Sequence, residues 1–387
     1  MKKTVLSMVV VVTLSMGDAY VEHPHERIEE SKQTTLKTKI PIAEKNISDR
    51  VHFKGDLRLR YESIERDDAT NKYRNRYRLR LGSVVDMTDN LHAEMGMRSG
   101  FANPTSGNQT FANDKPLKDY FFQSLGVNIL GLAYKFDDST LKIGRQPYMM
   151  YRPIKSQLVW DNDVSLNGVS YQYIDNTKIV TLGLTQPTLE EASVARDNIN
   201  LISAQYVHKT KLGDAKLNLG TGIYYYDGVK GNTAIFGSSK GNSIVNNVYA
   251  NDYHIAHGFS ELQFKDVFGK PLKMAASIAY NVAAKENNLG YDLAVKLGKA
   301  KKVGEWQVKY SYTVLESDSV FGAYSDSDNF GGGTAARGHA IRTKYKMGKE
   351  LYLAGSFFFS KLDESKSKIA GMEAKYDRVQ LDCIVKF

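Results

Sequence analysis

The chain has 387 residues, of which 42% are hydrophobic and 25% are charged, and it contains one cysteine, Cys383. A single cysteine excludes an internal disulfide framework. The formal net charge of +9 comes from Lys and Arg spread along the chain rather than gathered in runs, which argues against a nucleic-acid-binding surface.

The chain begins with a segment that has the order of a secretory signal peptide. Lys2 and Lys3 precede an apolar run over residues 5–16, and Gly17 and Ala19 supply small residues for a signal peptidase. The run is too short to cross a bilayer as a helix, and no later stretch approaches about 18 consecutive apolar residues. We therefore expect residues 1–19 to be a signal peptide and the protein to be exported.

Residues 20–50 are polar, mixed in charge and without clear apolar periodicity. This composition is typical of a segment that does not bury a core. We expect a flexible periplasmic extension. A short helix, or a piece of plug inside a lumen, is the alternative interpretation.

From residue 51 onward, apolar residues recur at every second position. In residues 51–62, Phe53, Leu57, Leu59 and Tyr61 alternate with charged residues. A period of two predicts a strand with one apolar face, and about 9–12 residues is the length that a tilted strand needs to cross a bilayer. Similar segments lie at 73–85, 91–98, 217–225, 272–280, 306–314 and 351–359.

Short turns and long polar connections alternate between these segments. The short turns are 86–90, 137–140, 175–176, 210–214, 265–270, 298–304 and 347–349, and the long connections are 63–72, 99–118, 147–165, 186–200, 227–252, 282–289, 316–337 and 361–375. This alternation is typical of barrels with short periplasmic turns and long extracellular loops. We predict an all-β fold, a transmembrane antiparallel β-barrel of about sixteen strands over residues 51–387. Weak patterns at 121–136 and 141–145 leave about fourteen to eighteen strands open.

Arginines alternate with the apolar residues of several predicted strands. If Leu57 and Leu59 face lipid, Arg58 and Arg60 face the lumen, and the neighbouring strands add further guanidinium groups. Unpaired, such a wall would give a pore a mild preference for anions. The alternative is a structural role in which the arginines pair with Asp56, Glu62, Glu94 and Asp382. The predicted pore-lining residues are Arg58, Arg60, Arg74, Arg76, Arg78, Arg80, Arg98 and Arg378.

The connection 147–165 is unusually apolar for a solvated loop, since it contains Met149, Ile154, Leu158 and Trp160. We expect it to fold into the lumen as a constriction loop, with Asp161 and Asp163 opposite the arginines. An unrecognised strand or a subunit contact is the alternative.

The last segment, residues 376–387, alternates Val379, Leu381, Cys383 and Val385 with mostly polar residues and ends on Phe387. It resembles the closing strand of bacterial outer-membrane β-barrels. The resemblance implies that Phe387 is the signal read by the barrel-assembly machinery.

Several blocks resemble the putative-porin families of Gram-negative bacteria: Gly55–Glu62 with Leu-Arg-Leu-Arg, Asn75–Gly100 with Arg-Tyr-Arg-Leu-Arg, Leu141–Gln146 with Ile-Gly-Arg-Gln, and Asn167–Val169. The resemblance covers residues 51–387. It implies a passive or weakly selective channel for small hydrophilic solutes in the cell outer membrane, in contact with lipid and lipopolysaccharide. It also implies a homotrimer of the kind that general porins form, and it names no solute.

Catalytic motifs are absent from the sequence, which contains neither Gly-x-Ser-x-Gly nor Gly-x-x-x-x-Gly-Lys. His254 and His257 would point to opposite faces of a strand. We therefore expect no catalytic residue, no metal site and no cofactor. A barrel enzyme of the protease or lipase type and a solute-specific channel stay as alternatives. A plugged receptor is disfavoured because no plug-sized domain precedes residue 51.

Overall fold

The computed structural model describes residues 47–100, 103–111, 125–187 and 199–387. Within these ranges lie sixteen long strands, three two-residue strands and four short helices. The strands are β1 (Val51–Arg66), β2 (Lys72–Asp86), β3 (Leu91–Ser99), β4 (Gln109–Thr110), β5 (Leu125–Phe136), β6 (Ser139–Pro147), β7 (Ser165–Ile174), β8 (Lys178–Gln186), β9 (Asn200–Leu212), β10 (Ala215–Asp227), β11 (Ile244–Val245), β12 (Val248–Tyr249), β13 (Tyr253–Val267), β14 (Lys270–Asn281), β15 (Leu289–Gly298), β16 (Trp306–Leu315), β17 (Ala336–Lys346), β18 (Leu351–Leu362) and β19 (Ala374–Lys386). The helices are α1 (Ile47–Arg50) and the 3-10 turns η1 (Pro153–Lys155), η2 (Ile235–Gly237) and η3 (Asn329–Gly331).

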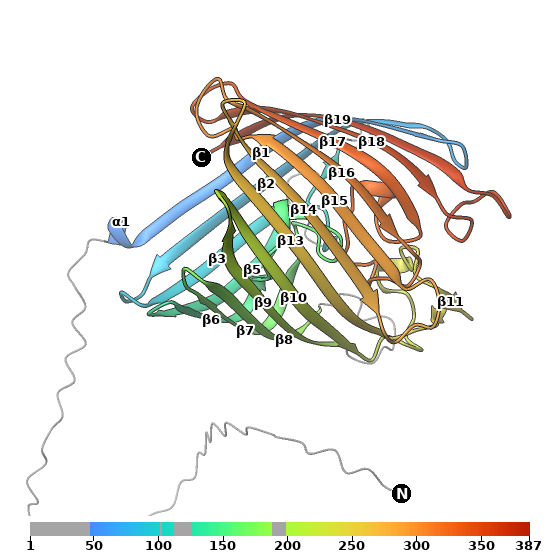
Figure 1. The fold of residues 1–387 in the computed structure, drawn as a ribbon, viewed down its shortest axis with the longest axis horizontal. Helices are drawn as coiled ribbons and strands as arrows, with labels where there is room; N and C mark the ends of the chain where they lie inside the picture. The colour runs from blue at the N-terminus through green and yellow to red at the C-terminus, as the bar shows by residue number, and fades with distance from the viewer. Residues whose placement is uncertain (1–46, 101–102, 112–124, 188–198) are drawn as a thin grey trace, which may run out of the picture. The chain divides into compact units, whose positions relative to one another are not determined.

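The sixteen long strands form one closed antiparallel barrel in which each pairs with its neighbours in the chain. The circle closes where β1, blue in Figure 1, lies beside β19, drawn in red, with a register that runs from Asp56 opposite Lys386 to Arg66 opposite Tyr376. Closure removes the free edges of this sheet, so each of its described long strands has a neighbour on both sides. The predicted fold and the strand number of about sixteen are confirmed.

The barrel strands alternate between outward apolar and inward polar residues. On β1, Leu57 and Leu59 are 38% and 48% exposed, whereas Arg60 and Glu62 are 5% and 0% exposed. A lipid-facing residue is exposed in the isolated chain, and an inward residue is covered by whatever fills the lumen. This difference fixes which face of each strand lines the channel.

The connections follow the predicted two-sided pattern with small shifts. The predicted loop 63–72 shortens to residues 67–71 because β1 continues to Arg66. The weakly patterned strands are β5, which begins at Leu125, and β6, which extends over Ser139–Pro147; residues 121–124 lie outside the described ranges. The predicted signal peptide 1–19 and most of the predicted extension 20–50 also lie outside them.

Three long connections pack together against the inner wall of the barrel. They contribute Trp160 from residues 148–164, Tyr249 from residues 228–252, and Phe321 and Tyr324 from residues 316–335. These rings meet Tyr224 and Tyr226 of β10, with ring-centroid distances of 5.6 Å from Trp160 to Tyr224 and 5.1 Å from Phe321 to Tyr226. The barrel therefore contains an internal hydrophobic core, which sets where open lumen remains.

Among the described residues, no helix is both long and apolar enough to cross a membrane.

Candidate functional site

The eight arginines predicted to line the pore all lie on inward positions of β1, β2, β3 and β19. Arg60, Arg78, Arg98 and Arg378 are buried, and the other four alternate with outward residues of β1 and β2. Closure brings β19 beside β1, so that Arg378 lies opposite Ile64. Residues far apart in the sequence therefore form one cluster, which we call the arginine cluster: Arg58, Arg60, Arg74, Arg76, Arg78, Arg80, Arg98 and Arg378.

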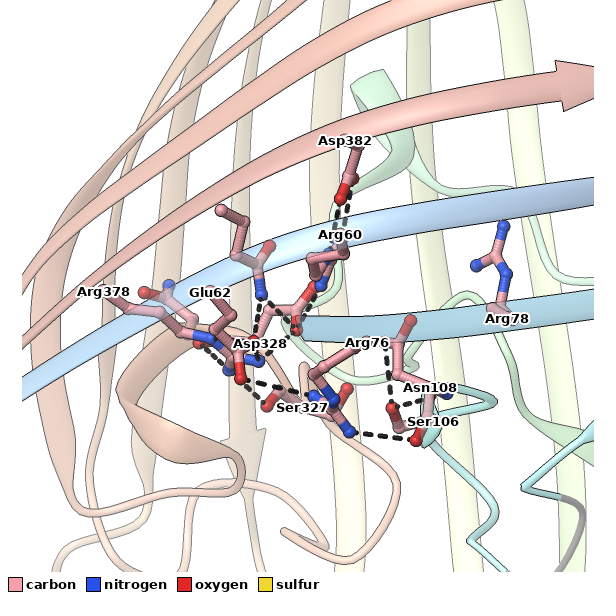
Figure 2. Close-up of polar contacts among 12 residues, drawn as sticks. Arg60, Glu62, Arg76, Arg78, Ser106, Asn108, Ser327, Asp328, Arg378 and Asp382 are labelled. Atoms are coloured by element: carbon pink, nitrogen blue, oxygen red, sulfur yellow. Dashed lines mark hydrogen bonds and ion pairs between the residues drawn. The ribbon is translucent and has the colours of Figure 1, made fainter. Parts of the chain in front are cut away.

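The arginine cluster is organised around carboxylates and is not the bare basic wall that the sequence suggested. Glu62, fully buried on β1, accepts hydrogen bonds from Arg74 and from Arg378, whose Nε lies 2.9 Å away, and from Gln380 at 3.1 Å. Arg76 lies 3.4 Å from the same carboxylate (Figure 2). One carboxylate thus serves three guanidinium groups.

Two further carboxylates pair with three more arginines of the cluster. Asp56 accepts hydrogen bonds from Arg78 and Arg80, each at 2.7 Å. Asp382 accepts two from Arg60, at 2.6 and 2.8 Å. Structural pairing, the alternative interpretation of the sequence, therefore describes most of the cluster.

Glu94 is the exception among the predicted partners. Its carboxylate pairs with Lys142 at 2.7 Å, and no arginine in the described ranges lies within ion-pair distance of it. The reason is geometric: β3 pairs with β5, which is followed by β6 and its Lys142.

The connection after β6 folds into the lumen, as its apolar composition predicted. The Ile154 N–H donates to Glu261 of β13 at 2.6 Å, and the Tyr151 N–H donates to Gln205 of β9 at 2.7 Å. Lys309 of β16 donates to the Ile154 carbonyl at 3.3 Å. Partners on three different strands show that the segment lies inside the barrel and is not another barrel strand; its part as a constriction stays a prediction.

Asp163 and Asp161 take different roles in this loop. Asp163 lies 3.3 Å from Arg80 and 4.0 Å from Arg78, and its carbonyl accepts a hydrogen bond from Arg98 at 2.8 Å. Burial alone would raise the pKa of the Asp163 carboxyl, but the charges of Arg78, Arg80 and Arg98 lower it. Asp163 therefore joins the constriction loop to the arginine cluster.

Asp161 does not reach the arginines. Its carboxylate accepts the N–H groups of Asp163 at 2.8 Å and Ser327 at 2.9 Å. Burial, together with the neighbouring charges of Asp163 and Asp326, raises its pKa. Its role is to hold the constriction loop against the connection 316–335.

We expect Asp163→Asn to loosen the constriction loop, because charge-assisted bonds worth roughly 1–3 kcal/mol are lost. Single-channel recordings should show larger open-state current noise than wild type, whereas Asn162→Ala, on the exposed side of the same loop, should not. An ordinary aspartate carboxyl has a pKa of about 3.9, and the arginine charges lower the pKa of Asp163 below that value. The ion pairs of Asp163 with Arg78 and Arg80 should therefore persist in wild type as the pH falls to about 3.9 and be lost only at lower pH. Identical noise in the two variants would contradict this role.

One partner of the cluster was missed by the sequence interpretation. Asp328, in the connection 316–335, lies 3.0 Å from Arg378, 3.6 Å from Arg60 and 3.0 Å from the Gln380 amide (Figure 2). Burial would raise its pKa, but the charges of Arg378 and Arg60 lower it. Asp328 lies in a Gly-, Ser- and Asp-rich loop without periodicity, so nothing in the sequence indicated that its side chain reaches the arginine cluster.

A second set of basic residues, also missed, lies on inward positions of β14–β17, which are separated from β19 by β18. Lys273, Lys296, Lys309 and Arg342 lie directly across from one another on β14, β15, β16 and β17, and we call them the lysine row. Like charges in direct cross-strand register destabilise a sheet. Lys273 pairs with Glu261 and Arg342 with Asp326, each at 3.0 Å. Within the described part of the chain, Lys296 and Lys309 have no carboxylate partner. The sequence could have predicted that these lysines face inward, because Lys273 alternates with Met274, and Lys309 alternates with Val308 and Tyr310.

The two histidines considered as metal ligands point in opposite directions. His257 is buried beside Tyr224 and Phe259, whereas His254 stacks on the outward ring of Tyr225 at 4.1 Å. In the ranges that the structure covers, no group of three His, Cys, Asp or Glu residues is arranged to hold a metal ion.

Comparisons with known proteins add family and fold. A family model described as "Putative porin" matches residues 64–267 and 240–387. The chain is similar in structure to OprB of Pseudomonas putida, with a TM-score of 0.59 and 11% identity over 88% of this chain and 95% of that one. It is also similar to OmpF of Salmonella typhi, solved in complex with daunomycin, with a TM-score of 0.52 and 12% identity over 87% and 97% of the two chains. At these identities the structural likeness supports the fold alone. A sequence comparison with curated proteins gave no match.

Proposed function

The chain belongs to the "Putative porin" family and is a channel of the outer membrane, and we propose that it conducts small hydrophilic solutes and ions passively, with a mild preference for anions. The proposal gives the arginine cluster and the lysine row different parts. Carboxylates within ion-pair distance neutralise much of the charge of the arginine cluster. The cluster therefore mainly stabilises the fold and contributes less to ion selectivity.

The observation that carries the anion preference is the lysine row. Lys296 and Lys309 occupy inward positions of β15 and β16. Among the described residues, neither lysine has a carboxylate partner. Unpaired charges along a confined pore set ion selectivity. Two unit charges about 4 Å apart interact by roughly 1 kcal/mol even at the dielectric constant of water. Two unpaired lysines can therefore favour anions several-fold at low ionic strength.

Reversal potentials in a KCl gradient test this proposal. Wild type should prefer chloride, and the preference should weaken as salt rises, because the Debye length falls from about 30 Å at 0.01 M to about 3 Å at 1 M. The double variant Lys296→Gln/Lys309→Gln should shift the reversal potential toward cations. The control Lys301→Gln/Lys302→Gln removes the same charge from the short turn after β15 and should behave as wild type. A cation-selective wild type, or equal reversal potentials in both double variants, would refute the anion preference.

Of the two interpretations, channel and barrel enzyme, we propose the channel alone, and we propose that the protein has no protease or lipase activity. Incubating the purified protein with phospholipid and peptide substrates, beside a conductance measurement, tests this: conductance without hydrolysis is expected.

We further propose partners that follow from the outer-membrane setting. The exposed apolar side chains of the outer wall, such as Leu130, Leu184, Ile223 and Phe359, suit contact with lipid and lipopolysaccharide. Phe387 would be recognised by the barrel-assembly machinery, and three copies would associate as a homotrimer. Signal-peptide cleavage after residue 19 and a periplasmic extension over 20–50 complete the proposed organisation.

A further inference from the structure

A small cavity with basic walls lies on the long-loop side of the barrel, above Glu62 and apart from the lysine row. Its volume is about 230 Å³. Six of its lining residues carry positive charge, and among the described lining residues none is Asp or Glu. The six are Arg66, Lys72, Arg74, Arg76, Lys240 and Arg378.

The positive charges around this cavity exceed the negative charges available to them. Arg74, Arg76 and Arg378 share the carboxylate of Glu62, and Arg378 also pairs with Asp328 at 3.0 Å. Lys72 and Lys240 have no ion-pair partner in the described part of the chain. The Arg66 guanidinium is the one with a carboxylate to itself, that of Asp68, at 2.7 Å. The cavity therefore has a net positive wall even after every described ion pair is taken into account.

A glycine-rich segment forms another wall of the cavity and leaves space in it. Gly331, Gly332 and Gly333 all adopt positive φ. At Gly333 (φ 84°), an added Cβ would lie 1.9 Å from the carbonyl oxygen of Lys240. This approach requires glycine, and it brings the segment that carries Lys240 against the cavity.

Lys366 lies close enough to the cavity to be affected by the positive charges of Lys240 and Arg66. Burial, followed by the charges of Lys240 and Arg66, lowers the pKa of Lys366 to about 7, although Asp363 acts in the opposite direction. The Lys366 ammonium donates to the carbonyls of Gly332 at 2.7 Å and Thr334 at 2.9 Å. Burial is the main cause of the lowered pKa, and the positive charges of Lys240 and Arg66 add to it; an anion in the cavity would offset the contribution of these two charges.

We propose that this cavity is a binding site for a small oxyanion with more than one negative charge, which it captures from outside before the solute enters the lumen. Guanidinium groups bind carboxylate, phosphate and sulfate oxygens through paired hydrogen bonds. At about 30 Å³ per water molecule, a volume of about 230 Å³ corresponds to roughly eight waters, which is room for an anion of a few heavy atoms. The site deepens the proposed function, because it names the class of solute that an anion-preferring channel would take up.

Titration calorimetry on the folded porin in non-ionic detergent at low salt tests the site. Inorganic phosphate, sulfate and succinate are titrated separately, with chloride as the reference anion. At least one of the three should bind saturably, and which one binds identifies the oxyanion. The variant Lys72→Gln/Lys240→Gln should bind that anion about tenfold more weakly, since a contact with a charged group worth roughly 1.4 kcal/mol is lost. The control Lys230→Gln lies on the same connection as Lys240 but outside the cavity, and it should bind as wild type.

Two results would overturn the site: no saturable binding of any of the three oxyanions, or the same affinity in Lys72→Gln/Lys240→Gln as in Lys230→Gln. Neither depends on current through the channel. A cation-selective reversal potential would instead overturn the proposed preference of the channel and leave the calorimetric result standing, so the two failures are distinguishable.

Discussion

Deleting Phe387 is expected to remove nearly all of the protein from the outer membrane and to leave it unassembled in the periplasm. In the folded barrel this residue adds one pair of hydrogen bonds at the end of the seam. Its N–H donates to the Gly55 carbonyl at 3.1 Å, its carbonyl accepts the Gly55 N–H at 2.7 Å, and the residue is 61% exposed. The seam between β1 and β19 continues without it from Asp56 opposite Lys386 to Arg66 opposite Tyr376. A large loss of assembly would therefore reflect failed recognition rather than a weakened barrel.

The comparison of variants makes this distinction measurable. Phe387→Tyr keeps a terminal aromatic ring and should assemble, and Phe268→Ala removes a 95% exposed ring from the short turn after β13 and should also assemble. The heat-modifiable band in outer-membrane fractions gives the amount of folded protein. Normal surface levels of the deletion variant would mean that the last strand is an ordinary strand.

Glu62→Gln should cause the largest loss of stability of any single charge removal in the lumen. The carboxylate is fully buried and is shared by Arg74, Arg76 and Arg378. Its loss leaves three guanidinium groups close together with one fewer counter-charge, and breaking a buried pair typically costs about 3–5 kcal/mol. Guanidinium chloride unfolding in detergent, followed by tryptophan fluorescence, measures the change.

Glu94→Gln is the matched control, because it removes the same charge from an inward-facing pair with Lys142 that is partly exposed, at 23% and 18%. Partly solvated pairs are worth roughly 0–1 kcal/mol, so this variant should unfold close to wild type. Equal losses of stability in the two variants would show that Glu62 does not hold the arginine cluster together. If Glu62→Gln still conducts, its reversal potential should move further toward chloride.

The sequence predicted the barrel well because lipid imposes a strict period of two. That period placed Arg58, Arg60 and Arg378 on the inner face before any pairing was known, and the structure has them there. The apolar content of residues 147–165 likewise predicted an inward loop, since Trp160 and Leu158 have no place in a solvated connection.

The neutralisation of the arginines could not be predicted with the same ease. Glu62 and Asp56 are sequence neighbours of Arg58 and Arg60, but their partners are set by strand register, which periodicity does not specify. Asp328 reaches the cluster from a connection whose path depends on packing inside the lumen. The lysine row becomes visible only when four strands are aligned, because each contributes one basic residue.

The aromatic core inside the barrel has a consequence for the order of folding. Trp160 and Tyr324 meet at a ring-centroid distance of 6.1 Å although a large part of the chain separates them. Contacts between such distant residues form slowly, because the entropy of loop closure opposes them until other structure has shortened the path. Pairing of each strand with its neighbour in the chain is local and can come first. In the newly closed barrel, the lumen would then be wider and filled with more water than in the mature protein. The lumen would reach its final width only when the three connections pack inside it and displace that water.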